Sequence, residues 1–241
     1  FRRQLLVLPT GTGKTICFGE LAARAAQRKE RTLVLAHRDE LIQQAVDKIY
    51  RHSGVYPDVE KGPTHATRQA PITVGSIQTL HEKRLALWDK NAIDYIVIDE
   101  AHHSLADSYQ RILEYFPWVR VLGVTATPDR GDKRTLGSVY ENIAYEYTLP
   151  QAIHDGFLSP IVAKLIPLQI DLTGVKTVAG DYDVGELDAR VSDHLEAAAI
   201  ALAEHAGNRK TLVFLPLVKT SMRFAELCRD KGLSARHIDG A

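Results

Sequence analysis

A short stretch near the N-terminus, LLVLPTGTGKT at residues 5–15, constrains the fold more than any other part of the chain. An apolar run typical of a strand leads into a glycine-containing turn, and a helical pattern that includes Cys17 follows at once. Gly11 and Gly13 allow the backbone to curl so that successive N–H groups face one anion, while the start of the helix adds positive potential. This succession predicts a phosphate-binding loop between a strand and a helix.

The side chains that close this loop indicate a nucleotide as the ligand. Lys14 is suited to reach the β- and γ-phosphates, and the Thr15 hydroxyl is suited to hold Mg²⁺. The strict pattern Gly-x4-Gly-Lys-[Ser/Thr] is not met because Leu8 occupies the place of its first glycine, so a purely structural turn stays open as the alternative. The residues expected to contact the triphosphate are Pro9, Thr10, Gly11, Thr12, Gly13, Lys14 and Thr15.

A second polar cluster follows a buried apolar run in DYIVIDEAHH, residues 94–103. Asp99 is suited to hold Mg²⁺ through water, and Glu100 to orient and polarise a water molecule that attacks a phosphate. Two adjacent carboxylates can also form a simply solvated strand end. Downstream of a phosphate loop they favour the first interpretation, so the sequence predicts binding and hydrolysis of a nucleoside triphosphate with Mg²⁺, as in an ATPase.

Short β-rich apolar runs alternate with helical periodicity over most of the chain. This pattern predicts an α/β fold in which helices cover both faces of a parallel sheet. The expected strands are Gln4–Leu8, Thr32–Ala36, Ile72–Gly75, Tyr95–Ile98 and Val119–Val124.

The pattern changes after Tyr147, where an extended segment broken by prolines leads into a loop-like stretch. Strand and helix signals then resume, with KTLVFL at residues 210–215 expected to form a strand. The stretches RTLVLAHRDELIQQA and KTLVFLPLVKTSMRFA share one strand–turn–helix pattern. Either duplication or two unrelated buried strands of similar composition explains this resemblance.

Charge and composition limit the class of protein without naming its task. Thirty basic residues balance thirty acidic ones, so a surface that attracts nucleic acid would have to be local. The two cysteines fall in helical patterns, where buried, reduced thiols are expected. No apolar run reaches the roughly 18 residues of a membrane span, and no signal peptide is recognised, so no membrane partner and a cytoplasmic location are expected.

The motifs PTGTGKT, DEAH and TATP, in this order, resemble motifs I, II and III of the superfamily 2 helicases and translocases. LVLAHRDEL resembles motif Ia, TVGSIQTL motif Ib, and KTLVFLPLVKTS the motif IV region. The DEAH box, the form of motif Ia and HDGFLSPI are most similar to the type III restriction-subunit, or ResIII-like, branch. The resemblance covers almost the whole chain.

The resemblance implies a RecA-like P-loop NTPase fold and a division of the chain. Residues 1–150 would form the helicase ATP-binding RecA-like domain, residues 151–190 a linker, and residues 191–241 the truncated start of a second RecA-like domain. The chain is expected to be a fragment that stops before motifs V and VI. Because the arginine that neutralises transition-state charge lies in motif VI of this family, the fragment is expected to be weakly active or inactive.

Several further site residues are implied by the resemblance alone. Thr125 and Thr127 would couple hydrolysis to domain movement, and His102 would link the nucleotide site to motif III, with an ordinary surface histidine as the alternative. No role is implied for His103. The positions expected to contact nucleic acid are His37, Arg38, Ser76, Gln78 and Thr79.

The nucleic-acid positions also have structural explanations. Ser76 can cap the turn that follows it, and Arg38 can pair with the neighbouring acids. The basic stretch at residues 127–138 either touches nucleic acid or is solvated.

The resemblance favours a helicase or translocase that moves along DNA, double-stranded or single-stranded, and allows a nuclease or modification subunit as partner. The alternatives are an ATP-operated switch or scaffold that does not translocate, and the motor subunit of a restriction nuclease.

Overall fold

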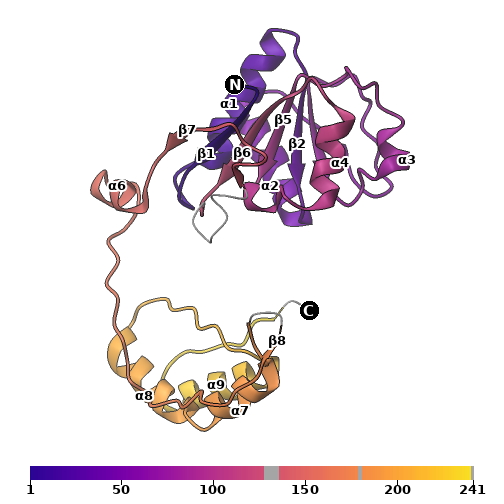
Figure 1. Ribbon diagram of the computed structural model, residues 1–241. Coiled ribbons are helices and arrows are strands. Elements are labelled where there is room, and N and C mark those ends of the chain that lie inside the picture. Colours follow the sequence, from indigo (N-terminus) through magenta and orange to yellow (C-terminus); the bar gives the residue numbers. More distant parts are fainter. Residues whose placement is uncertain (128–135, 179–180, 240–241) are drawn as a thin grey trace. The chain divides into compact units, whose positions relative to one another are not determined.

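The computed structural model describes residues 1–127, 136–178 and 181–239 (Figure 1). Internal contacts divide the chain into an N-terminal unit, Phe1–Pro160, and a C-terminal unit, Ile161–Ala241. Most of the basic stretch at residues 127–138 lies outside the described residues. Each unit is described by itself.

A parallel sheet forms the centre of the N-terminal unit. It has seven strands in the order β3-β4-β2-β5-β6-β1-β7. Every pairing within it is parallel. The strands are β1 (Arg3–Val7), β2 (Thr32–Ala36), β3 (Asp58–Glu60), β4 (Ile72–Ser76), β5 (Tyr95–Asp99), β6 (Arg120–Thr125) and β7 (Asn142–Glu146).

Helices cover both faces of this sheet, as the alternation of strands and helical patterns predicted. Successive side chains of a strand point to opposite faces, so Leu33 and Leu35 of β2 enter one apolar core and Val34 and Ala36 the other. The core with Val34 is closed by α1 (Lys14–Gln27) and α2 (Asp39–Ser53). The core with Leu33 is closed by α3 (Glu82–Leu85) and α4 (Asp107–Tyr115).

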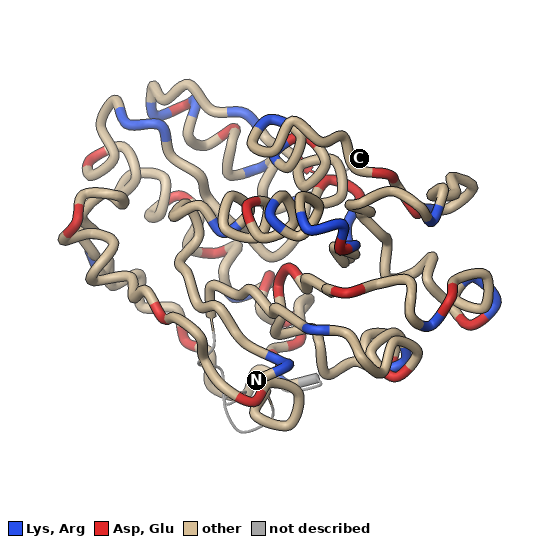
Figure 2. The backbone as a smooth tube through the Cα atoms, turned by 90° about the horizontal axis from the view of Figure 1, so that it is seen from above, with Lys and Arg blue, Asp and Glu red and all other residues tan. Residues whose placement is uncertain are grey.

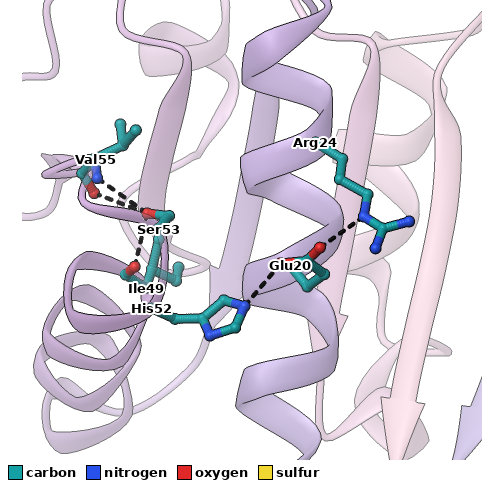
Figure 3. Close-up of polar contacts among 6 residues, drawn as sticks. All are labelled: Glu20, Arg24, Ile49, His52, Ser53 and Val55. Atoms are coloured by element: carbon teal, nitrogen blue, oxygen red, sulfur yellow. Dashed lines mark hydrogen bonds and ion pairs between the residues drawn. The ribbon is translucent and has the colours of Figure 1, made fainter.

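The two helices of the first face are joined by a polar contact as well as by packing. Phe18 of α1 is fully buried in the same core as Ile49 of α2. The Glu20 carboxylate of α1 lies 2.6 Å from Arg24 Nε on the same helix and 2.8 Å from His52 Nε2 on α2 (Figure 3). Hydrogen bonds from Arg24 and His52 hold the pKa of Glu20 below its usual value. This contact helps to fix how α2 is rotated on α1.

The five expected strands of the N-terminal unit agree with the structure to within one residue at each end. Two further strands, β3 and β7, were not expected. β3 has only three residues and no alternating pattern, and four of the five side chains of β7 are exposed. Both are outer strands, on which burial leaves little hydrophobic pattern.

The chain leaves the sheet through α6 (Leu149–His154), which begins with a capping box between Thr148 and Gln151. Phe157 and Leu158 then donate their N–H groups to the carbonyl of Ala152, which ends the helix. The predicted domain limits at 150 and 190 stay a prediction.

Helices make up most of the regular secondary structure in the described part of the C-terminal unit. It contains a two-stranded antiparallel pair, β8 (Thr177–Val178) with β9 (Asp181–Tyr182), and the helices α7 (Val184–Ser192), α8 (Leu195–Ala206) and α9 (Val218–Asp230). Leu195 and Ala199 of α8 pack with Phe224 and Cys228 of α9.

The strand expected at residues 210–215 is wrong. These residues have no regular secondary structure, and none of the described strands pairs with them. A β-strand obtains its backbone hydrogen bonds only from a neighbouring strand, so strand propensity alone does not produce one. Both cysteines are free, but Cys17 is exposed, which corrects the expectation that it is buried.

Charged residues of both signs are spread along the backbone (Figure 2), in keeping with a formal net charge of zero. Among the described helices, none is long and apolar enough to cross a membrane.

Candidate nucleotide site

The carboxyl ends of three adjacent strands gather the predicted site residues. β6 lies between β1 and β5 in the sheet. The glycine loop therefore follows β1 on one side, Thr125 ends β6 in the middle, and Asp99 ends β5 on the other side. Because parallel strands share one carboxyl edge, the sheet brings these three segments together.

The backbone of the loop takes the shape that the glycines were expected to allow. Gly11 has φ +93° and Gly13 has φ +94°, a left-handed conformation in which a Cβ atom is strained. Gly13 is the N-cap of α1, and the Thr12 hydroxyl donates to the Pro9 carbonyl at 2.7 Å. A Cβ atom on Gly11 would also lie 3.1 Å from the Leu158 side chain. In the first turn of α1, the N–H groups of Ile16 and Cys17 donate to the Gly13 carbonyl at 2.9 and 3.2 Å. The N–H groups that precede them lie at the start of a helix, where an anion is a suitable acceptor.

Lys14 at the start of α1 faces the second motif. Its Nζ lies 3.7 Å from Glu100 Oε1, and the two side chains are 12% and 29% exposed. The Nζ atom is buried and has no hydrogen-bond partner in the described part of the chain. A buried ammonium group held only by a long ion pair leaves its N–H donors unsatisfied, an arrangement that a phosphate would satisfy. Lys14 and the glycine loop therefore fit the phosphates of a nucleoside triphosphate.

Asp99 and Glu100 present two carboxylates at the end of β5. Burial raises the pKa of Asp99 above its usual value, and the Glu100 charge adds to this, whereas the Glu100 N–H, Lys14 and Lys48 act in the opposite direction. The Glu100 N–H donates to Asp99 Oδ1 at 3.0 Å. A cation beside Asp99 would stabilise the charged carboxylate and so offset the cost of burying it.

This donor set suits Mg²⁺. Magnesium is commonly held by one or two oxygen ligands of the protein, together with substrate phosphates and water. The Thr15 hydroxyl at the start of α1 and the Asp99 carboxylate at the end of β5 both line one cavity with Lys14 and Glu100. They are the residues that would hold the ion.

The backbone at Glu100 is unusual. Its φ is +53° and ψ is +56°, and it caps the short 3₁₀ helix η1 (Ala101–His103). A residue other than glycine adopts this left-handed conformation at a cost of roughly 1–2 kcal/mol. The conformation turns the chain sharply after β5 and sets where the Glu100 carboxylate lies relative to Lys14.

His102 joins the second motif to the third. Its Nδ1 lies 3.5 Å from Glu100 Oε2 and 3.5 Å from the hydroxyl oxygen of Thr125, which is fully buried. The N–H of Thr127 donates to the same Thr125 oxygen at 3.3 Å. These distances place His102, Thr125 and Thr127 in one group beside Glu100, and their role in coupling stays a prediction.

One wall of the cavity comes from residues that the sequence did not single out. The cavity measures 580 Å³ and is lined by the glycine loop, Asp99 and Glu100 on one side and by α2 on the other. The lining residues of α2 include Gln44, Lys48 and Arg51. They lie on the polar side of an amphipathic helix, and only the way α2 packs on α1 decides that this side faces a cavity. Their spacing of three to four residues was the available signal.

The five positions predicted to contact nucleic acid lie at the ends of β2 and β4, and the side-chain polar atoms of three of them, Ser76, Gln78 and Thr79, already have partners. The Ser76 hydroxyl donates to Gln78 Oε1 at 2.8 Å, and Gln78 Nε2 donates to the His37 carbonyl at 2.7 Å. Thr79 Oγ1 accepts the Gly62 N–H at 2.8 Å. Arg38 is exposed, and the neighbouring Asp39 pairs with Lys61 at 3.0 Å. Nucleic-acid contact at these positions stays a prediction.

Comparison with known protein families shows which family this chain belongs to. Residues 1–130 match the model of the family described as type III restriction enzyme, res subunit. The chain belongs to this family. The match confirms the resemblance to the ResIII-like branch of the superfamily 2 helicases that motifs I, II and III carried.

Two curated relatives of this res-subunit family member are longer proteins. The chain is 34% identical over 200 residues to a Saccharomyces cerevisiae protein named as the ATP-dependent helicase IRC3, covering 76% of the chain and 28% of the relative. It is 30% identical over 212 residues to the type I restriction enzyme EcoAI endonuclease subunit of Escherichia coli, covering 78% of the chain and 25% of the relative. The chain thus spans little more than a quarter of these two proteins.

A solved structure supports the fold. The fragment structure of an HsdR subunit of a type I restriction enzyme from Vibrio vulnificus YJ016 is similar with a TM-score of 0.68 and 22% identity. The similarity covers 96% of the chain and 42% of that structure. Together with the parallel sheet covered on both faces, this confirms the α/β RecA-like fold expected for the N-terminal unit.

Proposed function

We propose that this family member is the ATP-driven motor portion of a nucleic-acid helicase or translocase. The observation that carries the proposal is the buried Lys14 ammonium group at the end of the glycine loop, which lies 3.7 Å from Glu100 and has no hydrogen-bond partner among the described residues. A phosphate that accepts hydrogen bonds from Lys14 and the loop N–H groups would lie beside Glu100, the carboxylate that is suited to activate water.

Each motif has a role in this proposal. The loop from Pro9 to Thr15 binds the triphosphate of ATP, and Thr15 and Asp99 hold Mg²⁺, which neutralises phosphate charge when bound. Glu100 orients the attacking water and accepts its proton. His102, Thr125 and Thr127 transmit the state of the nucleotide to the rest of the chain.

DNA is the proposed track. The names of the relatives include an endonuclease subunit of a restriction enzyme, which favours DNA over RNA and allows a nuclease or modification subunit as partner. His37, Arg38, Ser76, Gln78 and Thr79 are the proposed contacts, through phosphates and not bases, as a motor indifferent to sequence requires. A cytoplasmic location remains an expectation.

Two variants separate nucleotide binding from hydrolysis. Lys14→Glu places a negative charge where phosphate should lie, so we expect no saturable binding of a fluorescent ATP analogue. Glu100→Gln keeps the shape of the site, so we expect nearly unchanged binding and a turnover reduced by about 10²- to 10⁴-fold. Intact affinity in the Lys14 variant would contradict the phosphate-loop assignment.

Turnover with different polymers tests the motor itself. We expect ATP hydrolysis by the natural full-length protein to be stimulated by duplex or single-stranded DNA and less by single-stranded RNA. Equal rates with and without any polymer would favour the ATP-operated switch. The same assay on the 241-residue chain tests whether the chain alone is weakly active, and turnover equal to that of the full-length protein would refute this expectation.

A further inference from the structure

Three histidine rings lie in contact between β2 and β5 at the carboxyl edge of the sheet. The ring centroids of His102 and His103 are 4.1 Å apart with an interplanar angle of 47°. Those of His103 and His37 are 4.6 Å apart at 63°, an edge-on arrangement. His37 directly follows β2, and His102 and His103 belong to η1. We name these three residues the histidine stack.

One end of the histidine stack touches the proposed catalytic group. His102 Nδ1 lies 3.5 Å from a Glu100 carboxylate oxygen and equally far from the Thr125 hydroxyl. Any displacement of the His102 ring therefore changes the surroundings of Glu100 and Thr125.

The other end is tied to the proposed nucleic-acid contacts. The His37 carbonyl accepts a hydrogen bond from Gln78, whose side chain in turn accepts from Ser76. The exposed Arg38 is the next residue in the chain. Gln78 and Arg38 are therefore linked directly to His37, and Ser76 is linked to it through Gln78.

His37 is half-buried and His103 is exposed, and their rings contact each other. Burial lowers the pKa of His37 below its usual value, and the nearby Arg38 charge adds to this. His103 is exposed, but partial desolvation of its ring still lowers its pKa, with further contributions from the charges of His102 and His37. The His37 Nδ1 atom is buried without a hydrogen-bond partner in the described part of the chain. The His37 ring therefore contacts the His103 ring without a hydrogen bond at its own Nδ1 atom among the described residues.

We propose that His103 is a positioning residue that couples nucleic-acid binding to ATP hydrolysis, by transmitting movement of His37 through His102 to Glu100. This inference rests on the proposed motor function. It assigns a role to the one histidine of the DEAHH segment for which the sequence offered none. Because the three rings are packed against one another, a shift of the Arg38 segment on a DNA backbone displaces all of them.

The test uses the natural full-length protein with His103→Ala, which removes the middle ring, and His103→Phe, which keeps a flat ring. For His103→Ala we expect unchanged turnover without DNA and a loss of about tenfold in stimulation by DNA. His103→Phe should restore most of the stimulation. His154→Ala, whose side chain is 88% exposed and lies outside the stack, is the matched control and should behave as the unsubstituted protein.

A binding measurement separates coupling from mere stability. Coupling is reciprocal, so a non-hydrolysable ATP analogue should change the DNA affinity of the unsubstituted protein, and this change should vanish in His103→Ala. The double variant His37→Ala with His103→Ala should lose no more stimulation than either single variant, since both interrupt one chain of contacts.

The outcomes are distinguishable. If the unsubstituted protein is not stimulated by any polymer, the motor proposal and this inference both fall. If it is stimulated and His103→Ala keeps that stimulation, only this inference is overturned. Equal loss of stimulation and of basal turnover in both His103 variants would also overturn it, because a damaged fold would then explain the result.

Discussion

Two segments with nearly the same sequence pattern adopt different structures in this chain. RTLVLAHRDELIQQA begins with β2, which lies between β4 and β5 and is buried at all five positions. KTLVFLPLVKTSMRFA begins with a segment that has no regular structure, in which Leu212 is 79% and Phe214 90% exposed. The comparison teaches that an apolar β-branched run becomes a strand only where neighbouring strands accept its backbone hydrogen bonds.

The helical halves of the same two segments do not differ in this way. Both α2 and α9 form, because a helix satisfies its backbone hydrogen bonds internally. Each also finds an apolar surface, since α2 buries Ile49 against α1 and α9 buries Phe224 against α8. Local sequence therefore specifies the helix in both places but the strand in only one.

The largest expected difference between the two units concerns a buried carboxylate in each. Glu60 is fully buried and accepts hydrogen bonds from Arg84 Nε and, at 2.9 Å, from the Ala66 N–H. Arg84→Ala removes the guanidinium partner of that charge and leaves only the more distant His65 ring at 4.0 Å, so it should cost about 3–5 kcal/mol of unfolding free energy. Urea unfolding followed by tryptophan fluorescence reports this, because both tryptophans, Trp88 and Trp118, belong to the N-terminal unit.

The matched variant in the C-terminal unit is Lys219→Ala. The Asp188 carboxylate lies 3.2 Å from the Lys219 ammonium group, and the Lys219 side chain is 76% exposed. Asp188 also accepts a hydrogen bond from the buried Thr220 hydroxyl. Loss of so exposed a partner should cost at most about 1 kcal/mol, measured by hydrogen exchange in α7 and α9. If Lys219→Ala lost as much unfolding free energy as Arg84→Ala, the expected difference between the two buried carboxylates would be wrong.

Apolar truncation in the two similar segments gives the next largest contrast. Leu33 in β2 is fully buried, so Leu33→Ala should lower the unfolding free energy by about 2–5 kcal/mol. Leu212 holds the equivalent place in the second segment and is exposed, so Leu212→Ala should change stability by no more than about 0.5 kcal/mol. Urea unfolding for the first and hydrogen exchange for the second provide the measurements. A large loss in Leu212→Ala would mean that residues 210–215 pack as a strand in solution.

The central strands could be predicted from sequence because burial on both faces makes them continuously apolar. β2 was predicted with its observed limits, and β1, β4, β5 and β6 to within one residue. β3 and β7 could not be, because outer strands carry little pattern, and the error at residues 210–215 arose because strand pairing is not a local property. Pairing partners far along the chain decide all three cases.

The site was predictable where one short segment carries its chemistry. Lys14 and Glu100 come from two such segments, and the sheet brings them to 3.7 Å. The cavity wall formed by Lys48 and Arg51 was not predictable, because a polar helix side gives no indication whether it faces solvent or a cavity. The contact of His103 with His37 was not predicted for a related reason. His37 follows β2 and His103 follows β5, and only the order of the strands in the sheet makes these two strand ends neighbours.

The two segments should also differ in their response to acid. His37 follows β2, and Pro216 holds the equivalent place in the second segment. Because burial lowers the pKa of His37 below its usual 6.5, the unfolded chain binds more protons than the folded one as the pH falls through 6.5. The contribution of His37 to stability is therefore full above that pH and declines below it. His103 acts in the same direction.

Urea unfolding of the N-terminal unit between about pH 7.5 and 5.5 measures this response. We expect stability to fall toward the acid end, and His37→Asn, which keeps a polar side chain that does not titrate in this range, to make the decline shallower. Hydrogen exchange at Leu217–Thr220 in the second segment should show no matching dependence. An unchanged slope in His37→Asn would rule out His37 as a source of the acid sensitivity.

The smallest expected effect concerns how the two helices begin. Neither N-cap side chain makes a capping hydrogen bond, but α2 has Asp39 and Glu40 in its first turn whereas α9 has no acidic residue there. Val218→Glu, at a position 51% exposed, would place a negative charge at the positive end of α9 and should stabilise it by about 0.3–1 kcal/mol at low salt. Asp39→Asn should destabilise α2 by a similar amount.

Hydrogen exchange at low and high salt distinguishes this electrostatic effect from a change in packing. Both changes in protection should shrink as salt screens the charge, because the interaction is exposed to solvent. Residues 210–215 should remain unprotected in Val218→Glu even though α9 is more stable. If they became protected, stabilising the helix would have been enough to form the strand, and the absence of neighbouring strands could no longer explain why the two segments differ.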